Sequence, residues 1–393
     1  MKLNEQVLNR ADYCIELRRW FHQHPEISLQ EFNTANKIEE ELDKLNIEHK
    51  RIGETGVYAK IQGKLGKGKV LAIRADIDAL KIQDLKENCA YRSLNEGVMH
   101  ACGHDGHTAS LLTTAAVLKE RENEFAGEIR LIFEQAEECG QGARLFVKAG
   151  CLEGVDRVIG YHGSSSLDVG TVSCTPGPNN ASCDYFKITV HGKSAHVSKP
   201  DQSIDALYIA SLIVVELQSI VSRRVSPLDT VVVGIGVLNS GTTYNIVANE
   251  AVLEGTTRSF SEETRQKVNG LVRSLSEEIA HAHKAEVEVH FESYANPLIN
   301  DSKVSDEVAE CARLIVGKEN VIQNQEKRLD ADDFADYLRE VPGCYMFVGT
   351  RNKSDFNTAS AHHHGSYDLD ENSMLIASSC IVKYAEKFFG LED

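Results

Sequence analysis

Residues 69–78, KVLAIRADID, decide the fold of this chain. Apolar residues run almost without interruption up to two closing aspartates, which predicts a buried strand. Residues 107–118 then place Ala, Leu and Val at helical spacing, and residues 128–133 and 157–161 are again strand-like. Strands that alternate with helices predict a largely parallel sheet covered by helices, an α/β architecture.

A second pattern follows residues 175–180, TPGPNN, whose prolines and asparagines indicate a linker. Strand-like and helical segments then occur in the order βαββαβ, at 185–191, 203–223, 230–237, 252–258, 262–283 and 287–291. This order predicts a ferredoxin-like unit. We therefore expect a catalytic metal-binding domain in two parts, 1–180 and 295–393, interrupted by an inserted lid and dimerisation domain at 181–294.

The composition excludes several classes of protein. With 393 residues, 42% of them hydrophobic and 26% charged, the chain is long and apolar enough to bury a core, so it is not disordered. Its formal charge of -17 argues against nucleic acid or an anionic membrane as a partner. Ten scattered cysteines, no apolar run of membrane-spanning length and no secretory signal favour a cytoplasmic protein with reduced thiols.

Residues 99–109, MHACGHDGHTA, form the segment densest in chemical groups. Cys102 and His104 lie two residues apart on a glycine-containing turn, so a thiolate and an imidazole can converge on a metal ion. Taken alone, the segment is equally consistent with a buried cysteine beside loop histidines. Glu137 and Glu138 close the strand-like run RLIFEQAEE, and adjacent residues there point in different directions. One carboxylate can therefore bind metal while the other faces the substrate.

Histidines occur at two further places that bear on the site. His162 ends the run VIGYHG, and residues 362–364 are three consecutive histidines. A cysteine, several histidines and a glutamate at successive strand ends form the mixed ligand set of a Zn, Mn, Co or Ni site. If five such ligands converge, they exceed the three of a mononuclear catalytic zinc and indicate two ions that share a bridging ligand.

Taken together, these segments resemble the M20 metallopeptidase and amidohydrolase family. The similarity is to its branch of aminoacylases, N-acyl-amino-acid amidohydrolases and hippurate or auxin-conjugate hydrolases. It spans nearly the whole chain, at 18–28, 72–80, 97–109, 136–138, 192–196, 245–260, 332–337 and 362–371.

The resemblance implies two divalent metal ions per subunit. The implied ligands are the bridge Cys102, the pair His104 and His162 at one ion, and the pair Glu138 and His363 at the other. His363 is chosen from the three histidines because the family's ligand lies four residues before an aromatic residue, here Tyr367. Asp76 and Asp78 match an acidic pair that would orient the ligands.

The resemblance also assigns catalytic and substrate-binding roles. Glu137 would be the general base, and His196 of the lid would donate a hydrogen bond to the developing oxyanion and so contribute to both catalysis and substrate binding. Asn245 and Arg258 would hold the carboxylate of the amino acid. Relatives dimerise through the lid, so a homodimer is expected. Two departures beside ligands, Gly163 and Gly365, leave the substrate preference open.

The expected function is hydrolysis of the amide bond of an N-acyl amino acid, with an acetyl, other acyl or aroyl group, by a metal-dependent amidohydrolase. A dipeptidase or carboxypeptidase of the same family is an alternative, as is a non-catalytic metal-binding relative. A cysteine hydrolase that uses Cys102 with His104 or His107 is a further alternative. It leaves the glutamates, His162 and His363 without a role.

Overall fold

The computed structural model describes residues 1–391, which form two compact units. Unit 1 comprises Met1–Gly177, Asn300–Glu326 and the segment from Asp333 onward. Unit 2 comprises Pro178–Ile299 and Lys327–Asp332. Each unit has its own hydrophobic core.

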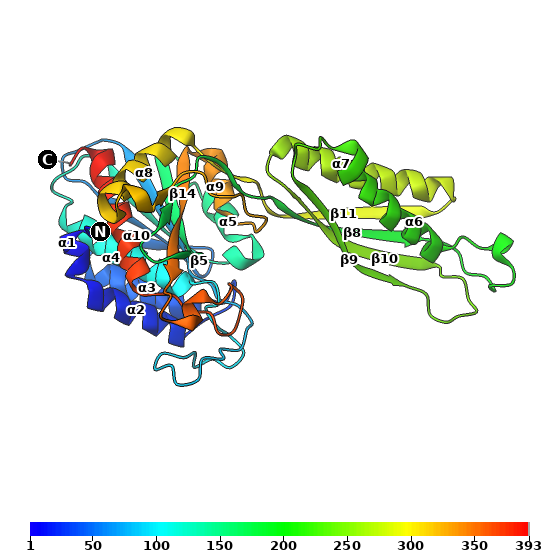
Figure 1. Cartoon of the computed structure of the whole chain (residues 1–393), viewed down its shortest axis with the longest axis horizontal. Coiled ribbons are helices and arrows are strands. Elements are labelled where there is room, and N and C mark those ends of the chain that lie inside the picture. Colours follow the sequence, from blue (N-terminus) through cyan, green and yellow to red (C-terminus); the bar gives the residue numbers. More distant parts are fainter. Residues whose placement is uncertain (392–393) are drawn as a thin grey trace. The chain divides into compact units, whose positions relative to one another are not determined.

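Unit 1 is built on an eight-stranded sheet (Figure 1). Its strands, in spatial order, are β1 (Glu48–Ile52), β2 (Gly56–Gln62), β4 (Glu128–Glu134), β3 (Val70–Asp76), β5 (Arg157–Asp168), β14 (Gly343–Arg351), β6 (Val172–Ser173) and β13 (Val321–Ile322). The four central strands, β4, β3, β5 and β14, run parallel, which confirms the predicted largely parallel sheet. Their carboxyl ends therefore meet at one edge.

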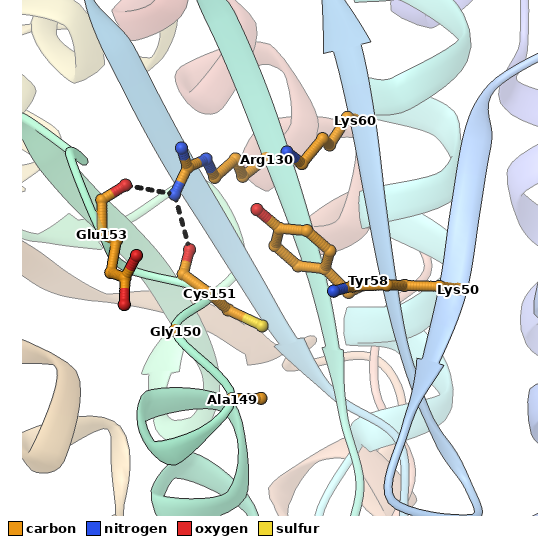
Figure 2. Close-up of a pocket in the computed structure, with 8 residues that line it drawn as sticks. All are labelled: Lys50, Tyr58, Lys60, Arg130, Ala149, Gly150, Cys151 and Glu153. Carbon is orange, nitrogen blue, oxygen red and sulfur yellow. Dashed lines mark hydrogen bonds between the residues drawn. The ribbon is translucent and has the colours of Figure 1, made fainter.

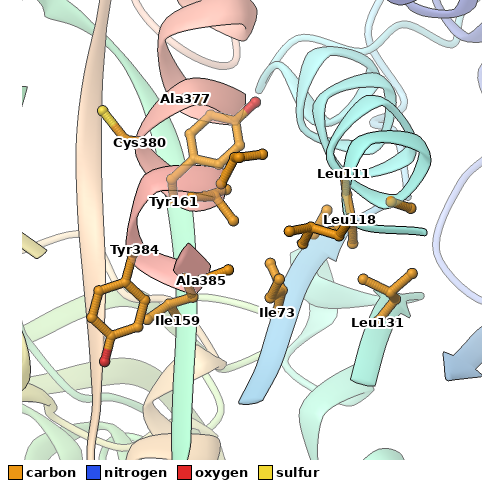
Figure 3. Close-up of a cluster of buried hydrophobic side chains, with 14 of the residues drawn as sticks. Ile73, Leu111, Leu118, Leu131, Ile159, Tyr161, Ala377, Cys380, Tyr384 and Ala385 are labelled. Atoms are coloured by element: carbon orange, nitrogen blue, oxygen red, sulfur yellow. The ribbon is translucent and has the colours of Figure 1, made fainter. Parts of the chain in front are cut away.

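Helices cover both faces of this sheet. The main core involves α2 (Ala11–Gln23), α3 (Phe32–Lys44), α4 (His104–Glu120), α8 (Ser302–Val316) and α10 (Asn372–Phe389), and the short α1 (Glu5–Leu8) packs beside α4 and α10. Figure 3 shows Ile73, Leu131 and Ile159 of three neighbouring strands directed toward α4 and α10. The opposite face carries α5 (Gly142–Lys148) and α9 (Phe334–Glu340), which contact each other.

Unit 2 has the predicted ferredoxin-like order. Its elements along the chain are β8 (Cys183–His191), α6 (Ala206–Ser219), β9 (Val231–Ser240), β10 (Glu250–Ser259), α7 (Glu262–Ala282) and β11 (Glu286–Ala295). The strands pair antiparallel in the order β11-β8-β10-β9, and both helices lie on one face (Figure 1). Two short strands, β7 (Gly177–Asn180) and β12 (Leu298–Asn300), form a separate two-stranded sheet.

The segment Ala206–Arg224 in unit 2 is long and apolar enough to cross a membrane by length and composition, contrary to the expectation from the sequence. Ile209, Ile213 and Leu217 are buried against the sheet, which explains part of this apolar character. Leu207 and Val215 are exposed on the other side. The segment is thus a core helix of unit 2 with an apolar outer face.

Arg74 of β3 joins three elements from the face opposite Ile73. The side chain is fully buried, and its guanidinium pairs with Asp76 at 2.5 Å, Glu134 at 2.8 Å and Asp333 at 3.2 Å. These carboxylates belong to the ends of β3 and β4 and to the residue that precedes α9. One cation therefore ties together the strand ends that carry the acidic residues.

We expect Arg74→Met to lower the free energy of unfolding by about 3–5 kcal/mol, because three carboxylates would stay buried without their common partner. Urea denaturation measures this loss. The control is Arg273→Met, since Arg273 and its partner Glu277 are 47% and 53% exposed; we expect it to cost less than about 1 kcal/mol. Equal losses in the two variants would contradict the structural role of Arg74.

Candidate metal centre

A tight turn before α4 presents the thiol and the imidazole of the first motif. Gly103, between Cys102 and His104, has a left-handed φ of 93° and precedes the first residue of α4. A Cβ atom there would lie 2.9 Å from the Tyr367 hydroxyl, so both the conformation and the packing require glycine. The turn places Cys102 and His104 at the carboxyl edge of the parallel strands.

The structure brings the five predicted ligands together. Ligand atoms of Cys102, His104 and Glu138 lie within 4.8 Å of one another. Cys102 Sγ is 3.4 Å from His162 Nε2, and His363 Nε2 is 3.3 Å from Glu138 Oε1. Residues separated by up to 261 positions in the chain thus form one cluster of soft and borderline donors.

The predicted acidic pair supports this cluster from behind. His104 Nδ1 lies 2.9 Å from the Asp78 carbonyl oxygen and 3.2 Å from its carboxylate, which leaves Nε2 directed into the cluster. Asp76 contacts His107 Nδ1 at 2.6 Å, and His107 Nε2 accepts a hydrogen bond from the Gly163 amide. Asp78 therefore orients a predicted ligand directly, whereas Asp76 acts through His107 on the strand beside His162.

The electrostatics of the cluster suit bound cations. His104 Nε2 and Glu138 Oε1 are buried and make no hydrogen bond with any residue that the structure describes. Burial alone would lower the pKa of His104, but Asp76, Asp78 and Glu138 raise it to about 10. Burial, Glu138 and Glu137 raise the pKa of the Cys102 thiol well above its usual range. A divalent cation offsets this negative charge and favours the thiolate, so the residues fit a metal site.

A histidine that the sequence analysis did not select also enters the cluster. His362 Nδ1 lies 3.7 Å from Cys102 Sγ, and Cys102, His162 and His362 form a second group with metal-ligand spacing. His363, the predicted ligand, is 52% exposed and has a left-handed φ of 63°. The histidine triplet predicted a metal ligand but not which of the three histidines it is. Neighbouring residues on a loop can exchange positions when the backbone conformation changes.

Glu31 is another supporting residue that the sequence analysis missed. Its buried carboxylate accepts hydrogen bonds from the Thr55 hydroxyl at 2.7 Å and the Ala136 amide at 2.9 Å. Ala136 has a left-handed φ of 57° and immediately precedes Glu137. Burial and the nearby Asp78 raise the pKa of Glu31 to about 7. Glu31 therefore fixes the strained turn that carries the two glutamates.

A buried network supports the histidine loop. The Lys86 ammonium lies 2.8 Å from His22 Nε2 and donates to the Tyr367 carbonyl at 2.9 Å. His22 Nδ1 is 2.7 Å from Asp105, which also accepts from Arg18 at 2.8 Å. Since Asp105 follows His104 and Tyr367 lies four residues after His363, the network links both ligand-bearing loops. Nothing in the sequence indicated that Lys86 belongs to such a network.

Unit 2 brings two of its three predicted site residues together. His196 is exposed and pairs through its backbone with Ile246, while the Asn245 carbonyl accepts from Val197 at 3.2 Å. Arg258 lies near the other end of β10 and donates to the Leu329 carbonyl at 2.9 Å. At about 3.3 Å per residue, the strand separates these ends by roughly 25 Å. Asn245 and Arg258 of one chain therefore lie far apart, and their shared role at one carboxylate stays a prediction.

The fold and the donor cluster define a class, an α/β protein with a dinuclear metal-ligand set at the carboxyl edge of its parallel strands. Residues 72–387 match the model of Peptidase family M20/M25/M40, and the chain belongs to this family.

Three relatives illustrate the similarity. The chain is 38% identical to an N-acetyl-L-cysteine deacetylase of Bacillus subtilis (strain 168) over 95% of this chain and 87% of that protein. It is 37% identical to thermostable carboxypeptidase 2 of Saccharolobus solfataricus over 98% of each chain. Its structure matches the YXEP protein of Bacillus subtilis, described as a dinuclear metal binding peptidase from the M20 family, with a TM-score of 0.83, 35% identity and coverage of 98% and 99%.

We expect His363→Ala to lose about one of two bound metal ions, because His363 approaches Glu138, whereas His362→Ala should retain both. Elemental analysis after dialysis against metal-free buffer measures the stoichiometry. The variants are matched, since each removes one imidazole from the same loop. Loss of metal from His362→Ala alone would assign the ligand to His362 instead.

Proposed function

We propose that this protein is a metal-dependent amidohydrolase that cleaves N-acyl amino acids into a carboxylic acid and a free amino acid. The observation that carries the proposal is a second, nearly buried carboxylate beside the donor cluster: Glu137 Oε2 lies 3.9 Å from His104 Nε2. A carboxylate next to metal ligands is placed to move a proton. The relative named N-acetyl-L-cysteine deacetylase supports an N-acyl amino acid as substrate.

The chain's own residues divide the work of amide hydrolysis. Cys102, His104, His162, Glu138 and His363 would hold two divalent cations, which would supply Lewis acidity to the scissile carbonyl and to the attacking water. Glu137 accepts the proton of that water and then delivers it to the departing nitrogen, because an amide anion is a poor leaving group. Asp78 keeps the ligating nitrogen of His104 directed inward.

Other activities make different demands on the same residues. A cysteine hydrolase needs a Cys102 thiolate, but its buried and acidic surroundings raise the thiol pKa and leave it a poor nucleophile without a cation. A carboxypeptidase or dipeptidase uses the same cluster, and the relative named carboxypeptidase supports this second candidate. A non-catalytic metal-binding protein would keep the ligands without needing Glu137.

The proposal is tested by restoring Mn, Zn, Co or Ni to the apoprotein and measuring hydrolysis of N-acetyl, longer N-acyl and N-aroyl amino acids alongside dipeptides. We expect N-acyl amino acids to be cleaved and a chelator to abolish turnover. Faster hydrolysis of dipeptides would favour the peptidase alternative. Retained metal without turnover on any of these substrates would indicate a binding protein.

We expect Glu137→Gln to retain both metal ions and to lower kcat by roughly 10²–10⁴, because the amide keeps the shape of the side chain but cannot accept the proton. Glu138→Gln is the matched variant and should weaken the binding of one ion. Steady-state kinetics and elemental analysis on the same preparations separate the two effects. If Glu137→Gln were the variant that loses metal, the base and the ligand would be exchanged.

We further propose that the protein is a homodimer through unit 2. β9 is an edge strand of ten residues in the sheet of this unit, and edge strands offer unpaired backbone groups to another chain. Val237 and Leu238 of β9 are 37% and 41% exposed, and Tyr244, in the loop that follows, is 94% exposed. His196 and Asn245 lie at the end of unit 2 away from Cys183 and Ala295, where the chain enters and leaves the sheet. A second subunit can therefore receive these residues at its metal centre.

This arrangement predicts complementation between inactive subunits. His196→Ala and Glu137→Gln homodimers should each have low activity. In an equal mixture, half of the dimers are hybrids, and each hybrid has one complete site of two, so we expect about a quarter of native kcat. Mixing after dissociation, followed by kinetics, measures the recovery. No recovery, despite hybrids seen by native mass spectrometry, would show that His196 acts within its own chain or not at all.

Reduced thiols support a cytoplasmic location. All ten cysteines are free, and seven of them are buried. Disulfides are rare in the reducing cytoplasm, where thiolate metal ligands such as Cys102 also persist. We therefore propose a cytoplasmic enzyme.

A further inference from the structure

A polar pocket of about 190 Å³ lies in unit 1, apart from the metal-ligand cluster (Figure 2). The alternation of side chains along β2 explains its position. Val57, Ala59 and Ile61 face the main core, whereas Tyr58 and Lys60 face the opposite side of the sheet. Strands β1 and β4 and the segment after α5 supply the remaining walls.

Cationic groups surround an aromatic ring in this pocket. The ammonium groups of Lys50 and Lys60 lie 5.5 Å and 5.7 Å from the centre of the Tyr58 ring. Figure 2 shows the Tyr58 hydroxyl directed toward the side where Arg130 and Lys60 lie. Tyr58 is only 4% exposed, and its hydroxyl has no hydrogen-bond partner among the described residues. The side chain is buried as a whole, but its hydroxyl oxygen keeps solvent contact in the pocket, so it can donate a hydrogen bond to a ligand there.

The charges of the pocket are not balanced. Arg130 is anchored, because it donates to the carbonyls of Cys151 and Glu153 at 2.9 Å and 2.8 Å and pairs with Glu128 at 2.5 Å. Lys60 lies 3.7 Å from the same Glu128. Lys50 makes no ion pair with any described residue. At the pocket itself, three cations face the carboxylates of Glu128 and Glu153, so one positive charge is in excess in a chain of formal charge -17. A further carboxylate, Glu48, lies opposite Lys60 in the adjoining pocket.

We propose that this pocket binds a small oxyanion, with Lys50 and Lys60 as its charge partners and the Tyr58 hydroxyl as a neutral hydrogen-bond donor. Its volume suits inorganic phosphate or a short carboxylate and is below the roughly 300 Å³ of sites for larger ligands. Cys151 serves only as part of the wall, since burial raises the pKa of its thiol to about 11 and suppresses nucleophilic chemistry. None of these residues belongs to the proposed catalytic machinery.

The test titrates the metal-loaded protein with inorganic phosphate and, separately, with acetate at constant ionic strength, by calorimetry and, for phosphate, by phosphorus NMR. Phosphate can also bind at the metal centre, so the comparison among variants identifies the pocket. We expect Lys50→Gln/Lys60→Gln to weaken the pocket component at least tenfold, and Tyr58→Phe, which removes only the hydroxyl, to weaken it by roughly three- to tenfold. The tighter of the two anions identifies the natural ligand as phosphate-like or carboxylate-like.

The matched control is Lys64→Gln/Lys67→Gln, which makes the same change in net charge at exposed positions outside the pocket. It should leave the affinity within about twofold of native. Melting curves confirm that each variant folds, and Tyr58→Phe keeps the test valid if the double variant does not. Equal binding by the native protein and both pocket variants would overturn the proposal. So would an equal loss of affinity in the control variant, or no binding by the native protein up to about 20 mM anion.

Discussion

Buried negative charge at the carboxyl ends of β3 and β4 is the constraint on which the rest of unit 1 depends. Asp76, Asp78, Glu134, Glu137 and Glu138 lie within a few residues of these two strand ends. Carboxylates cannot stay ionised in the interior unless cations or hydrogen-bond donors compensate them. Arg74 pairs with these carboxylates from within the sheet. On the outer side their neighbours are histidines and a thiol, and this set of donors has the spacing of metal ligands.

The groups that compensate these carboxylates lie on several sides of them. This explains how so many acidic side chains can be buried at one site. Arg74 neutralises the strand ends from the face that carries α9, while Asp78 and His107 support the predicted ligands from the core. Glu31 fixes the turn before Glu137, and the Lys86 network fixes the start of α4 against the histidine loop. Residues outside the cluster therefore support the turns and loops that carry the predicted ligands, which limits the motion of these segments.

Sequence patterns anticipated the elements and the donors because both depend on local periodicity and residue type. Strand ends followed by Asp, Glu or His predicted a shared edge, and the parallel strands produce it. The choice between His362 and His363 depends on loop backbone angles that periodicity does not encode. Asn245 lies just before the start of β10 and Arg258 near its end, so roughly 25 Å of strand separates them, which a motif match does not reveal. Lys86 and Glu31 act through burial, which their residue types argue against.

The glycines that depart from the family pattern have a packing explanation, and this bears on specificity. A Cβ at Gly163 would lie 2.9 Å from Thr350 Cγ2, and one at Gly365 would lie 2.4 Å from the Gln83 carbonyl oxygen. Both residues are buried, so they let neighbouring segments approach closely and do not line an open pocket. They therefore do not by themselves select the substrate. Any selection among substrates must therefore come from other side chains, because these two positions are occupied by the packing of the chain itself.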